Sequence, residues 1–358
     1  MNNKAVIAMS GGVDSSVAAY LMKQRGFDCI GVTMKLFANE DIGISREHSC
    51  CSLDDVEDAR SVAYSLDMPY YVFNFSDRFE TDVIDRFIHA YENGITPNPC
   101  IDCNRYLKFD KLYMRAKELD RDYVVTGHYA RVEKDENGRF LLKKALDDTK
   151  DQSYVLYCLT QEQLSHTIFP LGEMRKSQAR EIAESQGFIN ARKADSQDIC
   201  FVQNGSYADF IEQYTGKNYP DGDFLDKDGN IIGRHKGVIR YTVGQRKGLG
   251  ISAPGPLYVK AVNPVSNTVT LSYNDGLYSS IVKAGDINLI SVPEIKGEMR
   301  VKAKVRYRHT EQWATVTQNG DTITAVFDEP QRAVTCGQAL VLYDGDIVVG
   351  GGTIIEVE

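Results

Sequence analysis

The sequence predicts an α/β protein with an N-terminal parallel-sheet domain, a small β-rich middle domain and a C-terminal β-barrel. Up to about residue 205, strand-like and helix-like segments alternate, as βαβ units require. Beyond residue 206, short β-rich runs separated by turn clusters such as Asp228-Gly229-Asn230 replace that alternation. We therefore expect domains over residues 1–206, 207–278 and 279–358.

Apolar runs and helix stop signals define the elements of the first domain. A hairpin is predicted over 132–145, with Asn137-Gly138 as its turn. Gly26 and Gly187 each follow a helix-like segment and favour its end there. The predicted strands are Ala5–Met9, Cys29–Leu36, Tyr70–Phe75 and Tyr123–Thr126. The predicted helices are Val13–Arg25, Ser52–Leu66, Asp77–Asn93, Cys103–Leu119, Gln161–His166 and Ser177–Gln186.

The rest of the chain consists of short strand-like runs joined by hairpin signals. Asn319-Gly320 and Asp344-Gly345 are dipeptides typical of tight hairpin turns. Many short strands at regular spacing predict a barrel or sandwich. The predicted strands are Val238–Val243, Leu257–Val262, Thr268–Leu271, Met299–Tyr307, Trp313–Gln318, Thr322–Phe327, Ala339–Tyr343 and Ile347–Ile355.

The composition excludes several classes of protein. Of the 358 residues, 42% are hydrophobic and 25% are charged, which excludes global disorder. No apolar run approaches the roughly 18–20 residues that span a bilayer, and the short run Ala5–Met9 is too short for a signal peptide. We expect a cytoplasmic protein, monomeric and with no membrane partner. Its eight cysteines are then thiols rather than a disulfide framework.

The net charge of −9 argues against a nucleic-acid partner, since phosphate contacts need Lys and Arg. The distribution of charge argues the other way. Residues 229–274 contain no Asp or Glu, and a second stretch carries cations at alternate positions, which places them on one strand face. We expect both stretches to bind an RNA backbone; a solvated strand face is the alternative. The cations are Arg234, Lys236, Arg240, Arg246, Lys247 and Lys260 in the first stretch, and Arg300, Lys302, Lys304, Arg306 and Arg308 in the second.

Ser10-Gly11-Gly12-Val13-Asp14-Ser15-Ser16 lies between the first predicted strand and the first predicted helix. Glycines let the backbone approach a polyanion, and amides at a helix start point toward it. The serines add hydroxyl donors, and Asp14 can hold Mg²⁺ or orient the loop. The segment has neither the Walker ending nor the dinucleotide-binding spacing. We therefore expect a phosphate-binding loop of another kind, with an ordinary glycine-rich turn as the alternative.

Two regions contain cysteines that are candidates for a reactive or metal-binding role. Cys100 and Cys103 follow the rigid segment Thr96-Pro97-Asn98-Pro99, and Cys103 begins a predicted helix, where backbone amides lower a thiol pKa. No second Cys or His pair completes a zinc site, so we expect no structural zinc and no metal-ligating residues here. Cys200 follows Asp195 in a polar segment; the alternative for it is a buried core thiol. Cys50 and Cys51 lie in a predicted loop, and the sequence assigns them no role. Cys29, Cys158 and Cys336 are expected in the core.

Taken together, the SGGVDSS loop, TPNPxxxCN over 96–104 and DSxxICF over 195–201 resemble the tRNA-specific 2-thiouridylase family of the PP-loop ATP pyrophosphatases. Further matching stretches run along the whole chain: GVTMKL (31–36), TGHYAR (126–131), DQSY (151–154), TVGQRKGLG (242–250), VRYR (305–308) and CGQALVLY (336–343). The resemblance implies that residues 1–206 form a PP-loop, adenine nucleotide alpha hydrolase-like, catalytic domain.

The resemblance also implies the chemistry. ATP would adenylate the 2-oxygen of the wobble uridine of tRNAs for Lys, Glu and Gln. Cys200 would carry a persulfide delivered by a cysteine desulfurase or a sulfur-carrier protein, and Cys103 would be the nucleophile that resolves it through a Cys103–Cys200 disulfide. The implied nucleotide-binding residues are Ala8, Met9, Ser10, Gly11, Gly12, Val13, Asp14, Ser15, Met34 and Gly127. The implied tRNA-binding residues are Asn98, Pro99, Cys100, His128, Lys150, Asp151, Gln152, Arg306, Tyr307 and Gln338.

The sequence departs from the family pattern at Cys100, where some members have an Asp thought to act as a general acid or base. A thiol is a poorer proton shuttle at neutral pH, which puts that role in doubt. Cys100, Cys103 and Cys200 could instead hold a [4Fe–4S] cluster, as in related thiolases; we favour the disulfide relay. Two rival functions remain open: a PP-loop ligase acting on a small molecule, and a non-catalytic tRNA-binding protein.

Overall fold

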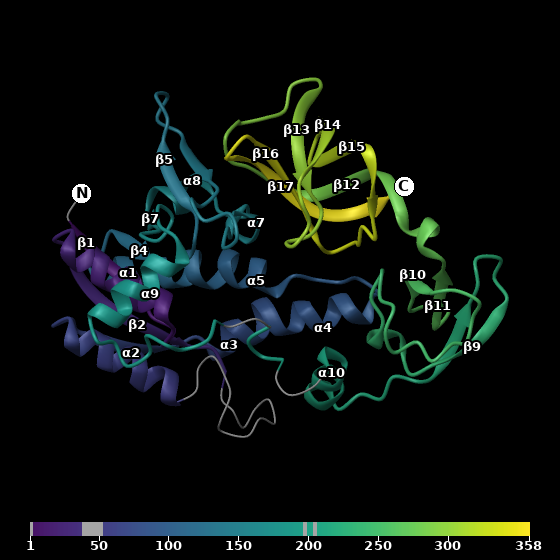
Figure 1. Cartoon of the computed structure of the whole chain (residues 1–358), viewed down its shortest axis with the longest axis horizontal. Helices are drawn as coiled ribbons and strands as arrows, with labels where there is room; N and C mark the ends of the chain where they lie inside the picture. Colours follow the sequence, from purple (N-terminus) through teal and green to yellow (C-terminus); the bar gives the residue numbers. More distant parts are fainter. Residues whose placement is uncertain (1–2, 38–52, 196–198, 203–205) are drawn as a thin grey trace. The chain divides into compact units, whose positions relative to one another are not determined.

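A computed structural model describes residues 3–37, 53–195, 199–202 and 206–358 of the chain (Figure 1). These residues fall into two compact units. The first takes residues 1–83, 99–204 and 345–349, and the second takes 84–98, 205–344 and 350–358. None of the helices in the described ranges combines the length and hydropathy that a membrane span needs.

A five-stranded parallel sheet forms the centre of the first unit, as the sequence predicts. The strand order β3-β2-β1-β4-β7 places β1 between two parallel neighbours. The chain therefore leaves β1 toward β2 on one side and reaches β4 on the other, which creates a topological switch point at the carboxyl ends of β1 and β4. The strands are β1 (Lys4–Ala8), β2 (Asp28–Lys35), β3 (Tyr70–Asn74), β4 (Tyr123–Val125) and β7 (Thr167–Ile168).

Helices α1, α2 and α9 share one apolar core with the sheet. Ala5 and Ile7, alternate residues of β1, pack with Val17 of α1, Val62 of α2 and Ala179 of α9. The helices of this unit are α1 (Val13–Gln24), α2 (Leu53–Ser65), α3 (Ser76–Phe79), α5 (Pro99–Asp102), the π-helix η2 (Cys103–Lys111), α6 (Leu112–Glu118), α7 (Ser153–Leu156), α8 (Gln161–Ser165) and α9 (Lys176–Ser185). The predicted hairpin forms as β5 (Arg131–Lys134) and β6 (Phe140–Lys143).

The second unit contains a four-stranded sheet with the order β10-β11-β8-β9. Phe224, Val259, Val269 and Leu271 form its small core. The π-helix η1 (Glu80–Ile84) ends at the first residue of this unit. The elements of the second unit that precede the barrel are α4 (Asp85–Glu92), α10 (Tyr207–Thr215), β8 (Gly222–Leu225), β9 (Ile231–His235), the 3₁₀ turn η3 (Val238–Arg240), β10 (Tyr258–Asn263), β11 (Thr268–Ser272) and the 3₁₀ turn η4 (Asn274–Leu277).

The last six strands close into a barrel, which confirms the predicted C-terminal architecture. They run in the order β12-β15-β14-β13-β16-β17, and pairing of β12 with β17 closes the ring. Closure leaves the barrel itself without a free sheet edge. The strands are β12 (Tyr278–Leu289), β13 (Met299–Lys304), β14 (Gln312–Asn319), β15 (Thr322–Arg332), β16 (Ala339–Asp344) and β17 (Ile347–Val357).

Two expectations for the β-rich part are wrong. The run 238–243 is not a strand: Gly237 and Gly244 flank it with positive φ angles of 93° and 87°, and Val238–Arg240 form the 3₁₀ turn between them. The predicted strand 299–307 ends at Lys304, and Arg306 and Arg308 lie in the turn that follows.

Replacement of Gly172 by Ala should lower the free energy of unfolding of the first unit by about 3 kcal/mol. The new Cβ would lie 1.9 Å from the carbonyl oxygen of Ala130, and backbone cannot yield cheaply. Gly187→Ala is the control, because its Cβ would meet nothing within 4 Å and only its positive φ of 67° adds strain, about 1 kcal/mol. Urea unfolding followed by circular dichroism measures both. Equal losses would contradict the predicted clash.

Candidate functional site

The phosphate loop lies at the switch point of the parallel sheet. Ala8 ends β1, and the loop runs from Ser10 into α1, which begins at Val13. Gly127 follows β4 and packs on the start of α1: a Cβ there would lie 2.7 Å from the Asp14 carbonyl carbon. The loop and the end of β4 therefore approach so closely that only glycine fits at position 127.

Hydrogen bonds within the loop hold its shape. The hydroxyls of Ser15 and Ser16 donate to the carbonyl oxygen of Gly12, at 3.0 and 3.1 Å. Ser15 Oγ also accepts from the Ser10 amide at 3.2 Å. Gly12 is the N-cap of α1 and has no side chain with which to cap it. The first-turn amides of α1 are thus available to an anion.

A close backbone contact explains why position 11 of the loop is a glycine. Its φ is 74°, and a Cβ would lie 2.3 Å from the Asp55 carbonyl oxygen of α2. The buried side chain of Asn190 then ties this region together, since its amide donates to the Gly11 carbonyl and to Ser16 Oγ, both at 2.9 Å. Lys193 Nζ lies 3.3 Å from the same Gly11 carbonyl and pairs with Asp55 and Asp58 at 2.5 and 2.6 Å.

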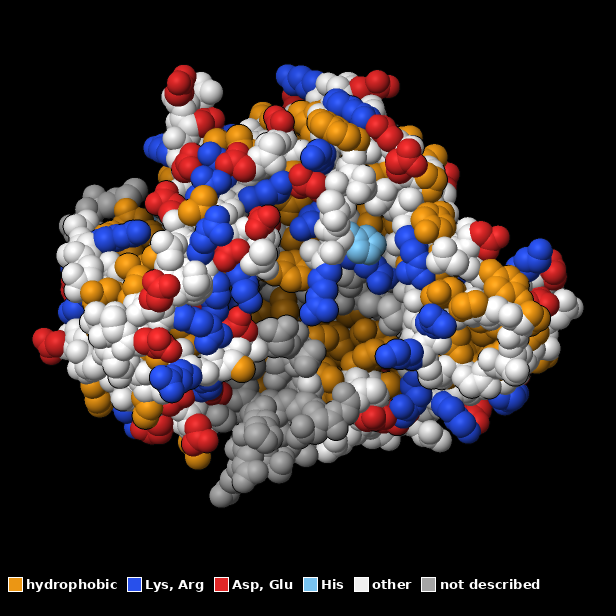
Figure 2. Space-filling view, in the orientation of Figure 1, with side chains coloured by type: hydrophobic (Ala, Val, Ile, Leu, Met, Phe, Trp, Pro, Cys, Tyr) orange, Lys and Arg blue, Asp and Glu red, His pale blue; other side chains and the backbone are white. Residues whose placement is uncertain are grey.

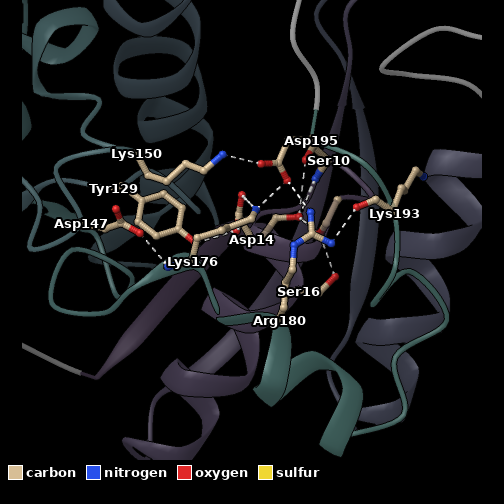
Figure 3. Close-up of polar contacts among 12 residues, drawn as sticks. Ser10, Asp14, Ser16, Tyr129, Asp147, Lys150, Lys176, Arg180, Lys193 and Asp195 are labelled. Carbon is tan, nitrogen blue, oxygen red and sulfur yellow. Dashed lines mark hydrogen bonds and ion pairs between the residues drawn. The ribbon is translucent and has the colours of Figure 1, made fainter. Parts of the chain in front are cut away.

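Three cations converge beside the loop on a single carboxylate (Figure 3). Asp195 Oδ1 lies 2.8 Å from Lys176 Nζ and 3.0 Å from Arg180 Nη2, and its Oδ2 lies 2.9 Å from Lys150 Nζ. Lys176 Nζ also donates to both oxygens of Asp14, at 2.8 and 2.7 Å. The phosphate loop thus carries an adjacent cluster of three cations and two carboxylates.

The cluster is charged, and the Lys176 ammonium at its centre is nearly withdrawn from water. The Lys176 side chain is only 10% exposed. Burial by itself would raise the pKa of Asp195, but hydrogen bonds from Lys176 and Lys150 outweigh it and lower that pKa to about 2. Tyr129 donates its hydroxyl to Asp14 Oδ1 at 2.9 Å, and burial together with the Asp14 charge raises the Tyr129 pKa. Tyr129 is therefore a neutral donor that orients Asp14.

Sequence reasoning missed most of this cluster. It gave no role to Tyr129, Lys176, Arg180 or Lys193, because a cation near a helix start has no distinctive pattern. Asp195 was part of a recognised motif but was also given no role. The signal that could have found Lys176 is its position at the first turn of α9, the helix that packs on α1. Only the fold shows that this turn faces the loop.

The three candidate thiols differ in exposure. Cys100 is exposed, Cys103 is buried and Cys200 is intermediate. Burial raises the pKa of Cys103, and Lys108 offsets this only in part. The expectation of a lowered pKa is therefore wrong, because helical structure begins at Pro99, four residues before Cys103, and leaves the thiol inside the helix rather than at its start.

Two of the remaining cysteines lie in the core, and the described residues contain no metal-binding group. Cys29 and Cys158 are core thiols, and burial raises the pKa values to about 11 and about 12. Cys50 and Cys51 lie outside the described residues. Among the residues that are described, no three His, Cys, Asp or Glu side chains gather into a metal site. The thiol set that a [4Fe–4S] cluster would need is thus not assembled.

Comparison with known proteins identifies the family. Family models match residues 3–204 (tRNA methyl transferase HUP domain), 208–273 (tRNA methyl transferase PRC-barrel domain) and 279–354 (aminomethyltransferase beta-barrel domain). The chain is 52% identical over 356 residues to the tRNA-specific 2-thiouridylase MnmA of Clostridioides difficile (strain 630), covering 99% of this chain and 98% of that one. It is 52% identical over 355 residues to the protein of the same name from Lachnoclostridium phytofermentans, covering 99% of each.

This chain belongs to the tRNA-specific 2-thiouridylase family. The region matched by the first family model, residues 3–204, includes the phosphate loop, the cation cluster and the three candidate thiols.

The nucleotide positions expected of a 2-thiouridylase surround the switch point. Met9 follows β1, and its carbonyl accepts from Thr33 Oγ1 at 2.6 Å. Met34 lies on β2, one strand away from β1, in register with Phe73 of β3. With Gly127 beyond β4, these positions lie on three neighbouring strands of one sheet.

Several expected tRNA-binding residues of this 2-thiouridylase-family chain make contacts within the protein. His128 is buried beside Phe109 and Phe169, its ring centroid 5.9 Å from each, and burial lowers its pKa well below the ordinary value. It is therefore neutral. Gln152 exchanges hydrogen bonds with the backbone of Tyr129, at 2.9 and 3.0 Å. Asp151 accepts from Ser153 and from the Ala145 amide.

In the second unit, Gln338 supports the segment that leads to the candidate thiols. Its amide donates to the carbonyls of Thr96 and Pro97, at 2.9 and 3.1 Å, and the Thr96 amide donates to the Cys336 carbonyl at 3.0 Å. Arg306 donates from Nη2 to the carbonyls of Val243 and Ala333, at 3.0 and 2.6 Å. Its guanidinium therefore also binds backbone of the same unit.

In the folded protein, acidic side chains pair with several cations of the two basic stretches. Within 229–274, Arg234 pairs with Asp223, Lys236 with Asp221, and Arg240 with Asp209 and Glu212. On β13, Arg300 pairs with Asp328 and Lys302 lies 3.6 Å from Glu311. Figure 2 likewise shows acidic side chains interspersed with Lys and Arg. The expected single-sign tracks are therefore neutralised in part.

Burial of the Cys103 thiol predicts an order of reactivity toward iodoacetamide. Cys100 should react first and Cys103 much more slowly at pH 7.5, because the reactive thiolate is both shielded and scarce. Since burial raises the pKa of Cys103, its rate should rise only at a more alkaline pH than that of an exposed thiol. Peptide mass spectrometry measures each site, with buried Cys158 as the slow control. Faster labelling of Cys103 than of Cys100 would contradict the structure.

Proposed function

We propose that this protein is an ATP-dependent sulfurtransferase that makes 2-thiouridine at the wobble position of tRNA. The observation that carries the proposal is the phosphate loop with Lys176 and Arg180 beside it, in a chain about 50% identical to named 2-thiouridylases. A thiolation assay with purified protein, ATP, Mg²⁺, tRNA and sulfide tests it, with nucleoside mass spectrometry as the readout. Absence of thiolated uridine would refute it.

ATP serves to activate a poor leaving group. The uridine 2-oxygen attacks the α-phosphorus, the bond to the bridging oxygen breaks, and pyrophosphate leaves. Amides of the α1 first turn and residues Ser10–Ser15 bind the phosphates, while Lys176 and Arg180 offset the charge that develops on pyrophosphate. Gly127 and Met34 border the adenosine. Asp14 would hold Mg²⁺, which would neutralise part of the phosphate charge.

Sulfur transfer follows at C2 of the adenylated uridine. The terminal sulfur of a Cys200 persulfide attacks C2, and AMP leaves with the former 2-oxygen. The Cys103 thiolate then attacks the Cys200 sulfur, which leaves the second sulfur on C2 and forms a Cys103–Cys200 disulfide. A cellular dithiol reductant restores both thiols, which fits a reducing cytoplasm. Because Cys103 is buried and its pKa is raised, it needs a local rearrangement before it can attack.

The substrate and the sulfur donor are assigned from membership of the 2-thiouridylase family. We propose tRNAs for Lys, Glu and Gln as acceptors, and a cysteine desulfurase or sulfur-carrier protein as donor. Asn98, Pro99 and Cys100 would contact the target base, while His128, Lys150, Asp151, Gln152, Arg306, Tyr307 and Gln338 would contact tRNA. We expect a monomer to suffice for this.

One observation weighs against methyl transfer, and one measurement distinguishes a small-molecule ligase from the proposed enzyme. The family descriptions that speak of methyl transfer do not account for a phosphate loop flanked by three cations, since common methyl donors carry no triphosphate. A ligase acting on a small molecule would release pyrophosphate without tRNA, whereas the proposed enzyme releases it only when tRNA is present. Measurement of pyrophosphate with and without tRNA distinguishes the two.

Replacement of Cys200 by Ser should abolish persulfide-dependent thiolation, a loss of about 10³-fold or more, because the sulfur carrier is removed. Binding of tRNA should remain within twofold of wild type, roughly, since the substitution changes one atom. Cys336→Ser is the control, because Cys336 has the same intermediate exposure and no assigned chemistry. Loss of tRNA binding in Cys200→Ser would instead indicate a structural cysteine.

Neutralisation of Arg246 and Lys247 to Gln should weaken tRNA binding about tenfold and reduce the salt dependence by about 2 charges. Both side chains are exposed, and no ion pair is found for them within the described part of the chain. The matched control is Arg234→Gln with Lys236→Gln, which removes two cations that already pair with Asp223 and Asp221. Filter binding at several salt concentrations compares them. Equal losses would show that acidic partners do not decide which cations meet RNA.

A further inference from the structure

Lys176 has no hydrogen-bond donor left for a phosphate. An ammonium group donates three hydrogen bonds. In this structure Lys176 Nζ makes two contacts with Asp14 and one with Asp195, all between 2.7 and 2.8 Å. If Lys176 is to bind ATP, one of the two carboxylates has to withdraw.

Asp195 is the carboxylate better placed to withdraw. Asp14 lies in the first turn of α1 and is held by Tyr129 as well as by Lys176. Asp195 lies in a segment without helix or strand, and its partners among the described residues are the side chains of Lys150, Lys176 and Arg180. Its two oxygens bind three cations, as the oxygens of a phosphate group would.

The charges of the cluster also favour exchange. Lys150, Lys176 and Arg180 carry three positive charges, while Asp14 and Asp195 carry two negative ones. A triphosphate brings more negative charge to the same cations than one carboxylate does. Repulsion between the triphosphate and Asp195 would then drive the carboxylate off.

We propose that Asp195 is an internal competitor of ATP: in the nucleotide-free protein its carboxylate occupies the cationic position that the phosphates take. Asp195 thereby lowers the affinity for ATP and keeps the three cations satisfied until the nucleotide arrives. This proposal rests on the proposed function, because it assumes that the loop binds ATP.

The Asp195→Asn variant of the full-length protein tests this competition. Isothermal titration calorimetry measures the binding of each probe. The probes are α,β-methylene-ATP with Mg²⁺, inorganic pyrophosphate and adenosine. If the carboxylate occupies the site in about nine molecules of ten, its removal lowers the Kd of the ATP analogue about tenfold. Pyrophosphate should tighten similarly, and adenosine should bind as in wild type, since competition acts only at the phosphates.

Two control variants make the result specific. Asp195→Glu keeps the charge and should bind the analogue within about twofold of wild type. Asp346→Asn removes one negative charge from the same unit, where it pairs with Arg131 and Lys143 instead, and should also leave binding unchanged. Thermal unfolding checks that each variant is folded.

The outcomes separate this inference from the proposed function. An unchanged Kd in Asp195→Asn would overturn the competition. A raised Kd would also overturn it, and would indicate that Asp195 positions the cations or holds Mg²⁺. If wild-type protein binds none of the phosphate probes, the proposed ATP-dependent function itself fails.

Discussion

The ion pair of Lys176 with Asp14 and Asp195 joins three separate parts of the N-terminal unit. Asp14 belongs to the phosphate loop and α1, Lys176 begins α9, and Asp195 precedes the segment that carries Cys200. Because the ammonium is nearly buried, the two carboxylates together compensate its charge in a poorly solvated place. The position of α9 on α1 and the shape of the phosphate site therefore depend on the same contact.

Burial sets a second constraint, which concerns the thiols. A sulfur-transfer enzyme has to protect its reactive sulfur from water and oxidants, yet attack requires a thiolate. Cys103, the resolving thiol of the proposed mechanism, is shielded, since it is buried and its pKa is raised. Cys100, three positions earlier, is exposed. The two cysteines of one C-x-x-C segment thus have opposite environments.

Folding brings acidic side chains beside the basic stretches and changes which cations are available to a polyanion. The absence of acids from 229–274 holds along the chain, but acids at 209–223 fold back onto Arg234, Lys236 and Arg240. The strand face of Arg300 and Lys302 meets Asp328 and Glu311 from elsewhere in the barrel. Of the cations in 229–274, Arg246, Lys247 and Lys260 are exposed and form no ion pair within the described residues, so these three, rather than the whole stretch, remain for a polyanion.

The sequence by itself determined the fold class, the phosphate loop and the three candidate thiols. These depend on local signals: alternation of apolar runs, glycines that a tight loop requires, and spaced motifs. Tertiary structure alone decided which residues face the loop, because Lys176, Arg180 and Asp195 lie 160 or more positions from it and approach only when α9 packs on α1. It also decided the environment of Cys103 and the pairing of the basic stretches. Burial and ion pairing depend on neighbours brought together by folding, and no local pattern records them.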